Sequence, residues 1–218
     1  MGAMNRVIHP IEQESFAILR GALATRYPDA PARPPLARAV LERIVHASAD
    51  LEYAEDLVLP DEAVLEQAAA ALREGAPVVA DVAMVAAGIT RRRALCRITD
   101  PRAAELAPTA NITRSAAALR LAAEEAGPGA IYVIGCAPTA LFELIERAET
   151  YQPLLVLGLP VGFVGAVESK QALRASGLPA VSNVSGKGGS AVAAAALNAL
   201  LYWEAGCERV SALPKESA

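Results

Sequence analysis

Residues 131–162, IYVIGCAPTALFELIERAETYQPLLVLGLPVG, decide the fold. The runs at 131–134 and 154–157 are short and continuously apolar, and a glycine follows each of them. Between them, residues 138–147 carry apolar side chains at helical spacing and begin with a proline, which suits the first turn of a helix. This order of strand, helix and strand predicts parallel pairing between two fully buried strands.

The same alternation extends on both sides of this stretch. Further buried strands are expected at residues 78–85 and 180–184, and further helices at 113–126, 167–175 and 189–202. Upstream, helices are expected from Pro10 to about residue 25, from about residue 36 to 46–48, and from Asp61 to just before Gly75. We therefore expect one α/β domain over residues 1–218: a three-layer fold with a mainly parallel sheet covered by helices on both faces, and an N-terminal helical extension. Residues 1–4, MGAM, are compatible with a cloning remnant and carry no functional weight.

The composition is that of an alanine-packed globular protein. Hydrophobic residues make up 54% of the chain and the mean hydropathy is +0.31, but 49 of the 218 residues are alanine and only 4% are aromatic. The most apolar stretches are too short, or too interrupted by proline and glycine, for a membrane span, which needs about 20 apolar residues. No basic region precedes an apolar run at the start, so no signal peptide is expected.

The charged residues and the cysteines limit the classes of ligand and the redox environment that are expected for this chain. The net charge of −4 and the pI of about 5.3 argue against a general nucleic-acid binder, although 17 arginines against three lysines favour local carboxylate or phosphate sites. Cys96, Cys136 and Cys207 are far apart and odd in number, which predicts no disulfide framework and a reduced, cytoplasmic setting. With only His9 and His46, a histidine-rich metal centre is excluded and no metal is expected.

Glycine-rich loops follow the predicted strands, at the edge where open parallel sheets bind ligands. They are AGITRRR at 87–93, GCAPTA at 135–140, GLPVGFVG at 158–165 and SGKGGS at 185–190. Glycine lets backbone N–H groups approach a ligand, and helix starts at Thr139 and Ser190 favour an anion. A nucleotide site is the obvious first hypothesis. The spacing of a phosphate loop is absent, however, because Val181 occupies the first glycine position and Gly188 follows Lys187. Tight turns alone remain the alternative explanation for each single loop.

His46 is the candidate proton donor. It lies near a predicted helix end, where the C-terminal partial charge favours the imidazolium by up to about 2 kcal/mol. Capping of a carbonyl is the structural alternative, and for His9 a structural role is the favoured interpretation. Cys136 has no suitable base nearby in sequence, so packing is favoured over a nucleophilic role. Residues 91–93, three arginines, are either a solvated run or contain one arginine that faces an anion.

Eight segments, in order, carry a resemblance to a known family. They are SFAI (15–18), RIVH (43–46), DVAMV (81–85), TRSAA (113–117), APTAL (137–141), GLPVGFV (158–164), ESK (168–170) and GGS (188–190). Each segment is weak alone, but their order and spacing over residues 9–198 make the set specific. The chain resembles the precorrin-8X methylmutases of cobalamin biosynthesis, including the cobalt-precorrin-8 branch.

The resemblance implies an isomerase that moves a methyl group from carbon 11 to carbon 12 of the corrin ring. It gives hydrogenobyrinate, or cobyrinate with cobalt, by a 1,5-sigmatropic shift helped by protonation and without a separate cofactor. His46 matches the family's histidine, the general acid, and the active sites are expected at a homodimer interface. A corrin is an apolar disc rimmed by carboxylates, which basic side chains and amide groups can bind. The implied substrate-binding residues are Ser15, Thr90, Arg91, Arg114, Thr139, Lys170, Lys187, Gly188, Gly189 and Ser190.

Two positions depart from the family pattern. Cys136 stands where an asparagine is expected, and Ser185–Gly186 stand where basic residues are expected before Lys187. These departures put one polar contact and one carboxylate contact in question, and neither affects His46. A corrinoid-binding or carrier protein without catalytic activity would use the same loops, and it is the alternative function.

Overall fold

The computed structural model describes residues 9–203 and contains a five-stranded sheet in the order β1-β5-β4-β3-β2. Four strands are parallel: β2 (Val78–Ala80), β3 (Ile131–Ile134), β4 (Leu155–Gly158) and β5 (Ala180–Asn183). The short edge strand β1 (Leu57–Val58) is antiparallel to β5. The predicted α/β fold with a mainly parallel sheet is therefore confirmed.

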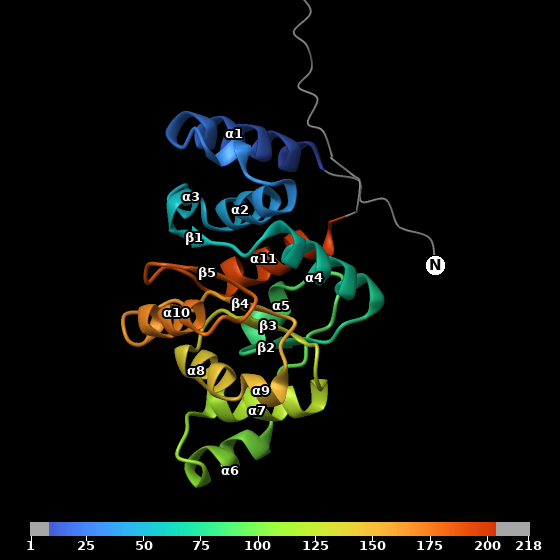
Figure 1. The fold of residues 1–218 in the computed structure, drawn as a ribbon, viewed down its shortest axis with the longest axis vertical. Helices are drawn as coiled ribbons and strands as arrows, with labels where there is room; N and C mark the ends of the chain where they lie inside the picture. The colour runs from blue at the N-terminus through green and yellow to red at the C-terminus, as the bar shows by residue number, and fades with distance from the viewer. Residues whose placement is uncertain (1–8, 204–218) are drawn as a thin grey trace, which may run out of the picture.

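Helices cover both faces of the sheet (Figure 1). One layer contains α7 (Arg114–Ala126), α8 (Pro138–Glu146) and α10 (Ala166–Ala175), with α6 (Pro101–Thr109) outside α7. The other contains α2 (Pro35–Ser48), α4 (Glu62–Glu74) and α11 (Ser190–Leu201), with α1 (Pro10–Arg26) outside α2. The helices of the first layer, α7, α8 and α10, lie in the connections between consecutive parallel strands, as right-handed crossovers predict, and α11 returns over the other face.

The remaining elements are short. They are the 3₁₀ helix η1 (Ala30–Ala32) and the helices α3 (Tyr53–Asp56), α5 (Ala83–Gly88) and α9 (Ala148–Tyr151).

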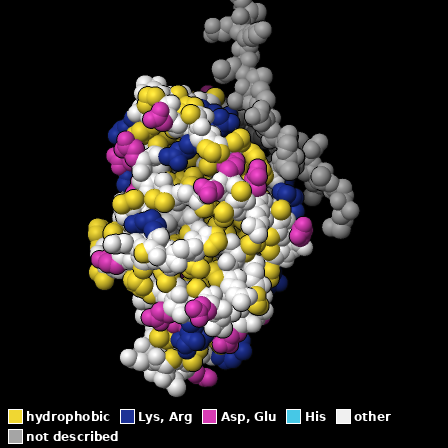
Figure 2. All heavy atoms as spheres, in the orientation of Figure 1, with side chains coloured by type: hydrophobic (Ala, Val, Ile, Leu, Met, Phe, Trp, Pro, Cys, Tyr) yellow, Lys and Arg dark blue, Asp and Glu magenta, His cyan; other side chains and the backbone are white. Residues whose placement is uncertain are grey.

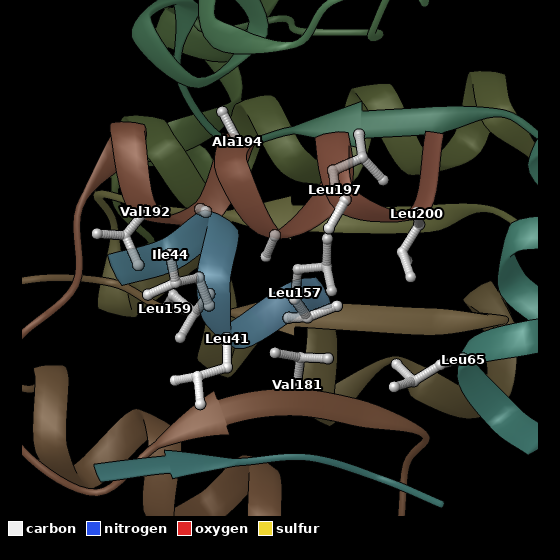
Figure 3. Close-up of a cluster of buried hydrophobic side chains, with 14 of the residues drawn as sticks. Leu41, Ile44, Leu65, Leu157, Leu159, Val181, Val192, Ala194, Leu197 and Leu200 are labelled. Carbon is white, nitrogen blue, oxygen red and sulfur yellow. The ribbon is translucent and has the colours of Figure 1, made fainter. Parts of the chain in front are cut away.

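The strands bury side chains on both faces, as their continuous apolar runs predict. In β3, Ile131 and Val133 belong to the core beneath α2 and α11, whereas Tyr132 and Ile134 belong to the core beneath α7 and α8. Figure 3 shows the first of these cores, in which Leu41 and Ile44 of α2 lie beside Leu157 and Val181 of the sheet and against the apolar side chains of α11.

Helix α2 is held at its start by a carboxylate from another helix. Glu62 Oε1 accepts a hydrogen bond from Leu36 N at 2.6 Å, and Oε2 accepts one from Ala37 N at 3.0 Å. A negative charge at a helix N-terminus is favourable, and the same dipole favours a cation at the far end. That far end carries His46 in its last turn, and Ala49 in a left-handed conformation ends the helix.

One predicted strand is wrong in its extent. The strand expected at 78–85 ends at Ala80, and Ala83–Gly88 form α5 instead. A short apolar run does not distinguish a buried strand from a buried helix. Here Asp81 N still donates to Val133 O at 3.3 Å, and α5 begins directly after Val82, its N-cap. The loop at 87–93 therefore follows a helix and not the carboxyl end of a strand.

Candidate active site

His46 is held by two residues of the outer helix α1. Ser15 Oγ lies 3.1 Å from His46 Nδ1. The ring of Phe16 stacks on the imidazole, with centroids 4.7 Å apart and planes inclined by 12°. Helix α1 is itself fixed to α2, because Arg20 Nε and Nη2 donate to the buried carboxylate of Glu42 at 2.9 and 2.8 Å. The orientation of the imidazole is thus defined on one edge and one face.

A pocket of about 410 Å³ opens beside this imidazole. Helix α1 supplies one wall and the end of α2 supplies the other, so that His46 and Ser15 are among its few polar groups. Its other lining residues are Ile11, Glu14, Ile18, Leu19, Ala22, Val45, Ala49 and Leu51. A mostly apolar pocket with a few converging polar groups is typical of a site for an organic ligand.

A row of rings and guanidinium groups runs from His46 toward the end of α11. The guanidinium of Arg43 lies 5.2 Å from the ring centroid of Phe16 and 5.3 Å from that of Tyr202. The guanidinium of Arg91 also lies over the Tyr202 ring, 4.3 Å from its centroid. Cations over aromatic faces are favourable contacts. The row therefore connects the 87–93 loop with the surroundings of His46.

Thr90 is fixed beside this row. Its Oγ1 lies 3.0 Å from Asn198 Oδ1 and 2.8 Å from Tyr202 Oη, and its N–H donates to the same amide oxygen at 2.9 Å. Within the arginine run, Arg92 donates inward to Leu72 O at the end of α4. Arg91 and Arg93 are exposed. The run is therefore divided, and Arg91 is the member that belongs to the row.

The loops that follow β3, β4 and β5 are joined to one another at the carboxyl edge of the sheet. The buried carboxylate of Asp81 accepts from Cys136 N and Ala137 N, each at 2.8 Å, and from Gly135 N at 3.2 Å. Burial raises the pKa of Asp81, and these amide donors oppose that shift. Gly162 N donates to Gly186 O at 3.1 Å. The predicted clustering of these three loops is therefore present.

The start of α11 is pressed against the loop after β4. Gly189 N donates to Leu159 O at 2.9 Å, and Cys136 Sγ lies 2.9 Å from Ser190 Oγ. Gly188 has a φ of 148°, and a Cβ built on it would fall closer than 3.0 Å to Leu159 O. Only glycine fits there. The Cys136 thiol thus lies against the start of α11.

Helix starts α7 and α8 meet through two threonines. Thr113, which caps α7 by accepting from Ala116 N, places its Oγ1 2.7 Å from Thr139 Oγ1 in the first turn of α8. Arg114 follows directly and is exposed. The structure therefore brings Arg114 and Thr139 to neighbouring helix N-termini, where anions are favoured.

The two lysines of the predicted set are placed differently. Lys170 is completely buried, and its Nζ donates to Asn183 Oδ1 at 2.9 Å, to Lys187 O at 2.7 Å and to Ser185 O. Its ammonium group therefore binds the protein's own loop, contrary to the expectation of a direct contact with a ligand carboxylate. Lys187 is partly exposed, and its Nζ forms ion pairs with Asp50 at 2.7 Å and with Glu52. Hydrogen bonds from Lys187 to these carboxylates raise its pKa.

Comparison with known proteins identifies the family of this chain. A family model for precorrin-8X methylmutase matches residues 10–203. The chain belongs to the precorrin-8X methylmutase family. A cobalt-precorrin-8 methylmutase of Salmonella typhimurium is 42% identical over 199 residues, which cover 88% of this chain and 93% of the relative. A precorrin-8X methylmutase of Sinorhizobium sp is 42% identical over 201 residues, 87% of this chain and 92% of the relative.

Solved structures agree with this membership. Precorrin-8x methyl mutase from Thermus thermophilus superposes with a TM-score of 0.73 at 33% identity, covering 88% of this chain and 96% of that one. A precorrin-8X methylmutase related protein gives the same TM-score at 32% identity, covering 83% and 97%. The methylmutase fold and the methylmutase function predicted from the sequence are both confirmed at the level of the family.

For a precorrin-8X methylmutase, several contributors to the site were missed from the sequence alone. Phe16 and Arg43 lay in the segments that carried the resemblance, but no role was assigned to them. Asp81 lay in a third such segment and was taken for part of a strand. Tyr202 carried no motif signal, and Asp50 was given no role in the site. His9 was predicted to be structural, and its Nδ1 accepts from Ile11 N at 3.2 Å as the N-cap of α1.

The described part of this methylmutase contains neither a metal-binding cluster nor a membrane-spanning helix. Within residues 9–203, no group of three or more His, Cys, Asp or Glu side chains is arranged to hold a metal ion. In the same range, no helix is long and apolar enough to cross a membrane. Cys207 lies outside the described residues, and Cys96 and Cys136 are free thiols.

Proposed function

We propose that this methylmutase converts precorrin-8X, or its cobalt form, by moving the methyl group from carbon 11 to carbon 12 of the macrocycle, with His46 as the general acid. Hydrogenobyrinate or cobyrinate is then the product. The observation that carries the proposal is the imidazole of His46, held by Ser15 and Phe16 at the wall of an apolar pocket. The relatives carry both substrate names at the same 42% identity, so the proposal covers both forms.

The contact with Ser15 suits a residue that gains and loses a proton. The hydroxyl oxygen of Ser15 can accept from the Nδ1–H of an imidazolium, and this N–H stays in place when Nε2 gives up its proton. The 3.1 Å contact can therefore persist while Nε2 delivers a proton to the macrocycle and recovers it after the methyl shift. The methyl shift is intramolecular, so the enzyme transfers only a proton to the substrate and takes it back afterwards. Positioned proton transfer of this kind contributes about 10²- to 10⁴-fold to a rate.

Carboxylates at the rim of the macrocycle are proposed to bind around this pocket. Arg91 and Arg114 are exposed guanidiniums, which suit bidentate carboxylate recognition. Amide groups at the starts of α8 and α11, near Thr139, Gly188 and Ser190, offer further anion sites, whereas Gly189 N is already bonded to Leu159 O. Thr90 and the partly exposed Lys187 complete the binding set, whereas the buried Lys170 is left out of it.

We also propose the homodimer that the family resemblance implies. Phe163 is fully exposed and Val164 is 88% exposed, in the loop between β4 and α10, and Val161, Val167 and Val184 are exposed nearby. Figure 2 shows hydrophobic side chains spread across the middle of the molecule, with few charged groups among them. Apolar side chains gathered in this way are typical of an interaction surface.

The cytoplasmic location of the protein also remains a prediction.

Incubation of the purified protein with precorrin-8X tests the chemistry. The wild type should give hydrogenobyrinate, detected by its absorbance and by unchanged mass, because an isomerase alters no atom count. His46→Ala should still bind hydrogenobyrinate but should lose about 10²-fold or more in kcat. Full turnover by His46→Ala would disprove the proton-donor role. An unchanged pigment in the wild-type reaction would favour the carrier function instead.

A further inference from the structure

Lys170 is a buried charged group that the proposed chemistry does not use. It projects from α10, no part of it is exposed to solvent, and its ammonium has three acceptors for its three protons: Asn183 Oδ1, Ser185 O and Lys187 O. Burial of a charge is costly unless it is fully hydrogen-bonded. Burial also lowers the pKa of Lys170 to about 8, with partial compensation from Asp56.

The carboxylate of Asp56 binds the same loop, but it accepts hydrogen bonds where Lys170 donates them. Its Oδ1 accepts from Ser185 N at 2.7 Å and from Val184 N at 3.1 Å, and its Oδ2 accepts from Ser185 Oγ at 2.7 Å. Burial acts to raise the pKa of Asp56, but the hydrogen bonds from Ser185 and Asn183 outweigh it and lower the pKa. Lys170 thus binds carbonyl oxygens of the loop, while Asp56 binds its N–H groups.

The buried amide of Asn183 links the two charges. Its Oδ1 accepts from Lys170, and its Nδ2 donates to Asp56 Oδ2 at 2.8 Å and to Lys187 O at 3.1 Å. The backbone from 183 to 187 is therefore fixed by side chains from α10, α3 and β5 together. The next three residues are Gly188, Gly189 and Ser190, where α11 begins.

We infer that Lys170 is a positioning residue, whose ammonium sets the course of the 183–187 loop so that the start of α11 can bind a carboxylate of the corrin substrate. The inference rests on the proposed function for the identity of that substrate. It assigns Lys170 a role in affinity without contact to the ligand. The loss of its three hydrogen bonds would release Ser185 O and Lys187 O and let the anion-binding amide groups move.

Lys170→Met tests the inference, because methionine has a similar length and shape without the charge or the donors. The probe is hydrogenobyrinate, titrated by absorbance, together with KM and kcat for precorrin-8X. We expect Kd and KM to rise about ten-fold or more, while kcat at saturation changes less than about three-fold. His46→Ala should show the reverse pattern, with a fall in kcat and little change in Kd. An unchanged Kd in folded Lys170→Met would overturn the inference.

The control separates positioning from general loss of stability. Leu173 lies on the same helix, is equally buried, and packs against Gly158 of β4 in the apolar core. Leu173→Ala should lower the thermal midpoint but leave the Kd of hydrogenobyrinate within about two-fold of the wild type. Should Lys170→Met fail to fold, Lys170→Gln, which keeps an uncharged donor, should give a smaller rise in Kd, and a Kd equal to the wild type there would also overturn the inference. Failure of the wild type to bind hydrogenobyrinate would refute the proposed function instead.

Discussion

Ser15 fixes one edge of the His46 imidazole. The effect of this contact on turnover can be measured separately from the affinity for the substrate. The hydroxyl touches Nδ1, on the side of the ring away from the nitrogen that would deliver the proton. Its removal leaves the Phe16 stack in place, since that contact is with the face of the ring. The imidazole would remain near its place, but one in-plane restraint would be gone.

Ser15→Ala is therefore expected to lower kcat by about ten-fold, the equivalent of one lost hydrogen bond of about 1.4 kcal/mol, with little change in the Kd of hydrogenobyrinate. Steady-state kinetics and an absorbance titration measure the two quantities. Ser48→Ala is the matched control, because Ser48 Oγ donates to Ile44 O in the same helix end and does not contact His46. Equal kcat for Ser15→Ala and the wild type would show that Ser15 does not orient the ring.

At this residue scale the sequence pointed to His46 and to Ser15 as a substrate-binding residue, but it did not place Ser15 and Phe16 against the imidazole. The position of His46 at a helix end is a local property that periodicity reveals. Its contacts with Ser15 and Phe16 join residues about 30 positions apart, and such pairings depend on how two helices pack. The contacts of Lys170 could not be predicted either, because a lysine in a helix is usually exposed. Nothing in the sequence indicates that its ammonium group donates to three oxygens of a loop.

At the scale of elements, the junction between β5 and α11 is the most constrained part of the site. Gly188→Ala should lower the free energy of unfolding by at least about 3 kcal/mol, because its φ of 148° and the approach of Leu159 O both exclude a side chain. Gly21→Ala is the control, since it lies inside α1 with no atom near its added methyl, and should stabilise the fold by about 0.5 to 1 kcal/mol. Urea denaturation measures both. A neutral Gly188→Ala would contradict the close packing of this junction.

Most longer elements were predictable because each one carries a local signal. Pro10, Pro138 and the pair Asp61 and Gly75 mark real helix ends. The edge strand β1 has only two residues, and its pairing with β5 is a long-range contact, so no local pattern revealed it. Helix α6 was missed although Asp100 and Pro101 are a recognisable start, in which the Asp100 side chain accepts from Arg102 N at 3.0 Å. Pro108 lies inside this helix, where a proline removes one backbone donor and is normally unfavourable.

At the scale of the whole molecule, the exposed apolar loop should control assembly. Phe163→Asp places a charge in the proposed interface and is expected to shift the protein from dimer to monomer in sedimentation velocity, with loss of activity at assay concentrations. Glu149→Lys, an exposed change in α9, should leave the dimer intact. A wild type that sediments as a monomer at every concentration would contradict the homodimer. Dimeric Phe163→Asp would place the interface elsewhere.

The dependence of stability on pH follows from the buried ionisable groups. Lys170 has a pKa of about 8 in the folded protein against 10.5 ordinarily, so between these values the unfolded chain holds a proton that the folded chain has released. Stability rises with pH wherever the unfolded state binds more protons. Lys170 therefore adds up to about 3 kcal/mol to the free energy of unfolding between pH 8 and 10.5. Burial acts oppositely on Tyr53, Tyr132 and Tyr151, whose pKa values are raised to about 12, so their contribution is lost only between pH 10 and 12.

Comparison of the wild type with Lys170→Met isolates the lysine from every other titrating group. From about pH 7.5 to about pH 9.5, the free energy of unfolding of the wild type should rise relative to that of the variant by about 2 kcal/mol, measured by urea denaturation at matched salt. The affinity for hydrogenobyrinate should fall over the same range, because a neutral amine has two protons for three acceptors. Parallel pH profiles for the two proteins would mean that Lys170 does not release its proton in this window. A rise in stability without a loss of affinity would mean that Lys170 releases its proton in this window but that its charge does not position the loop.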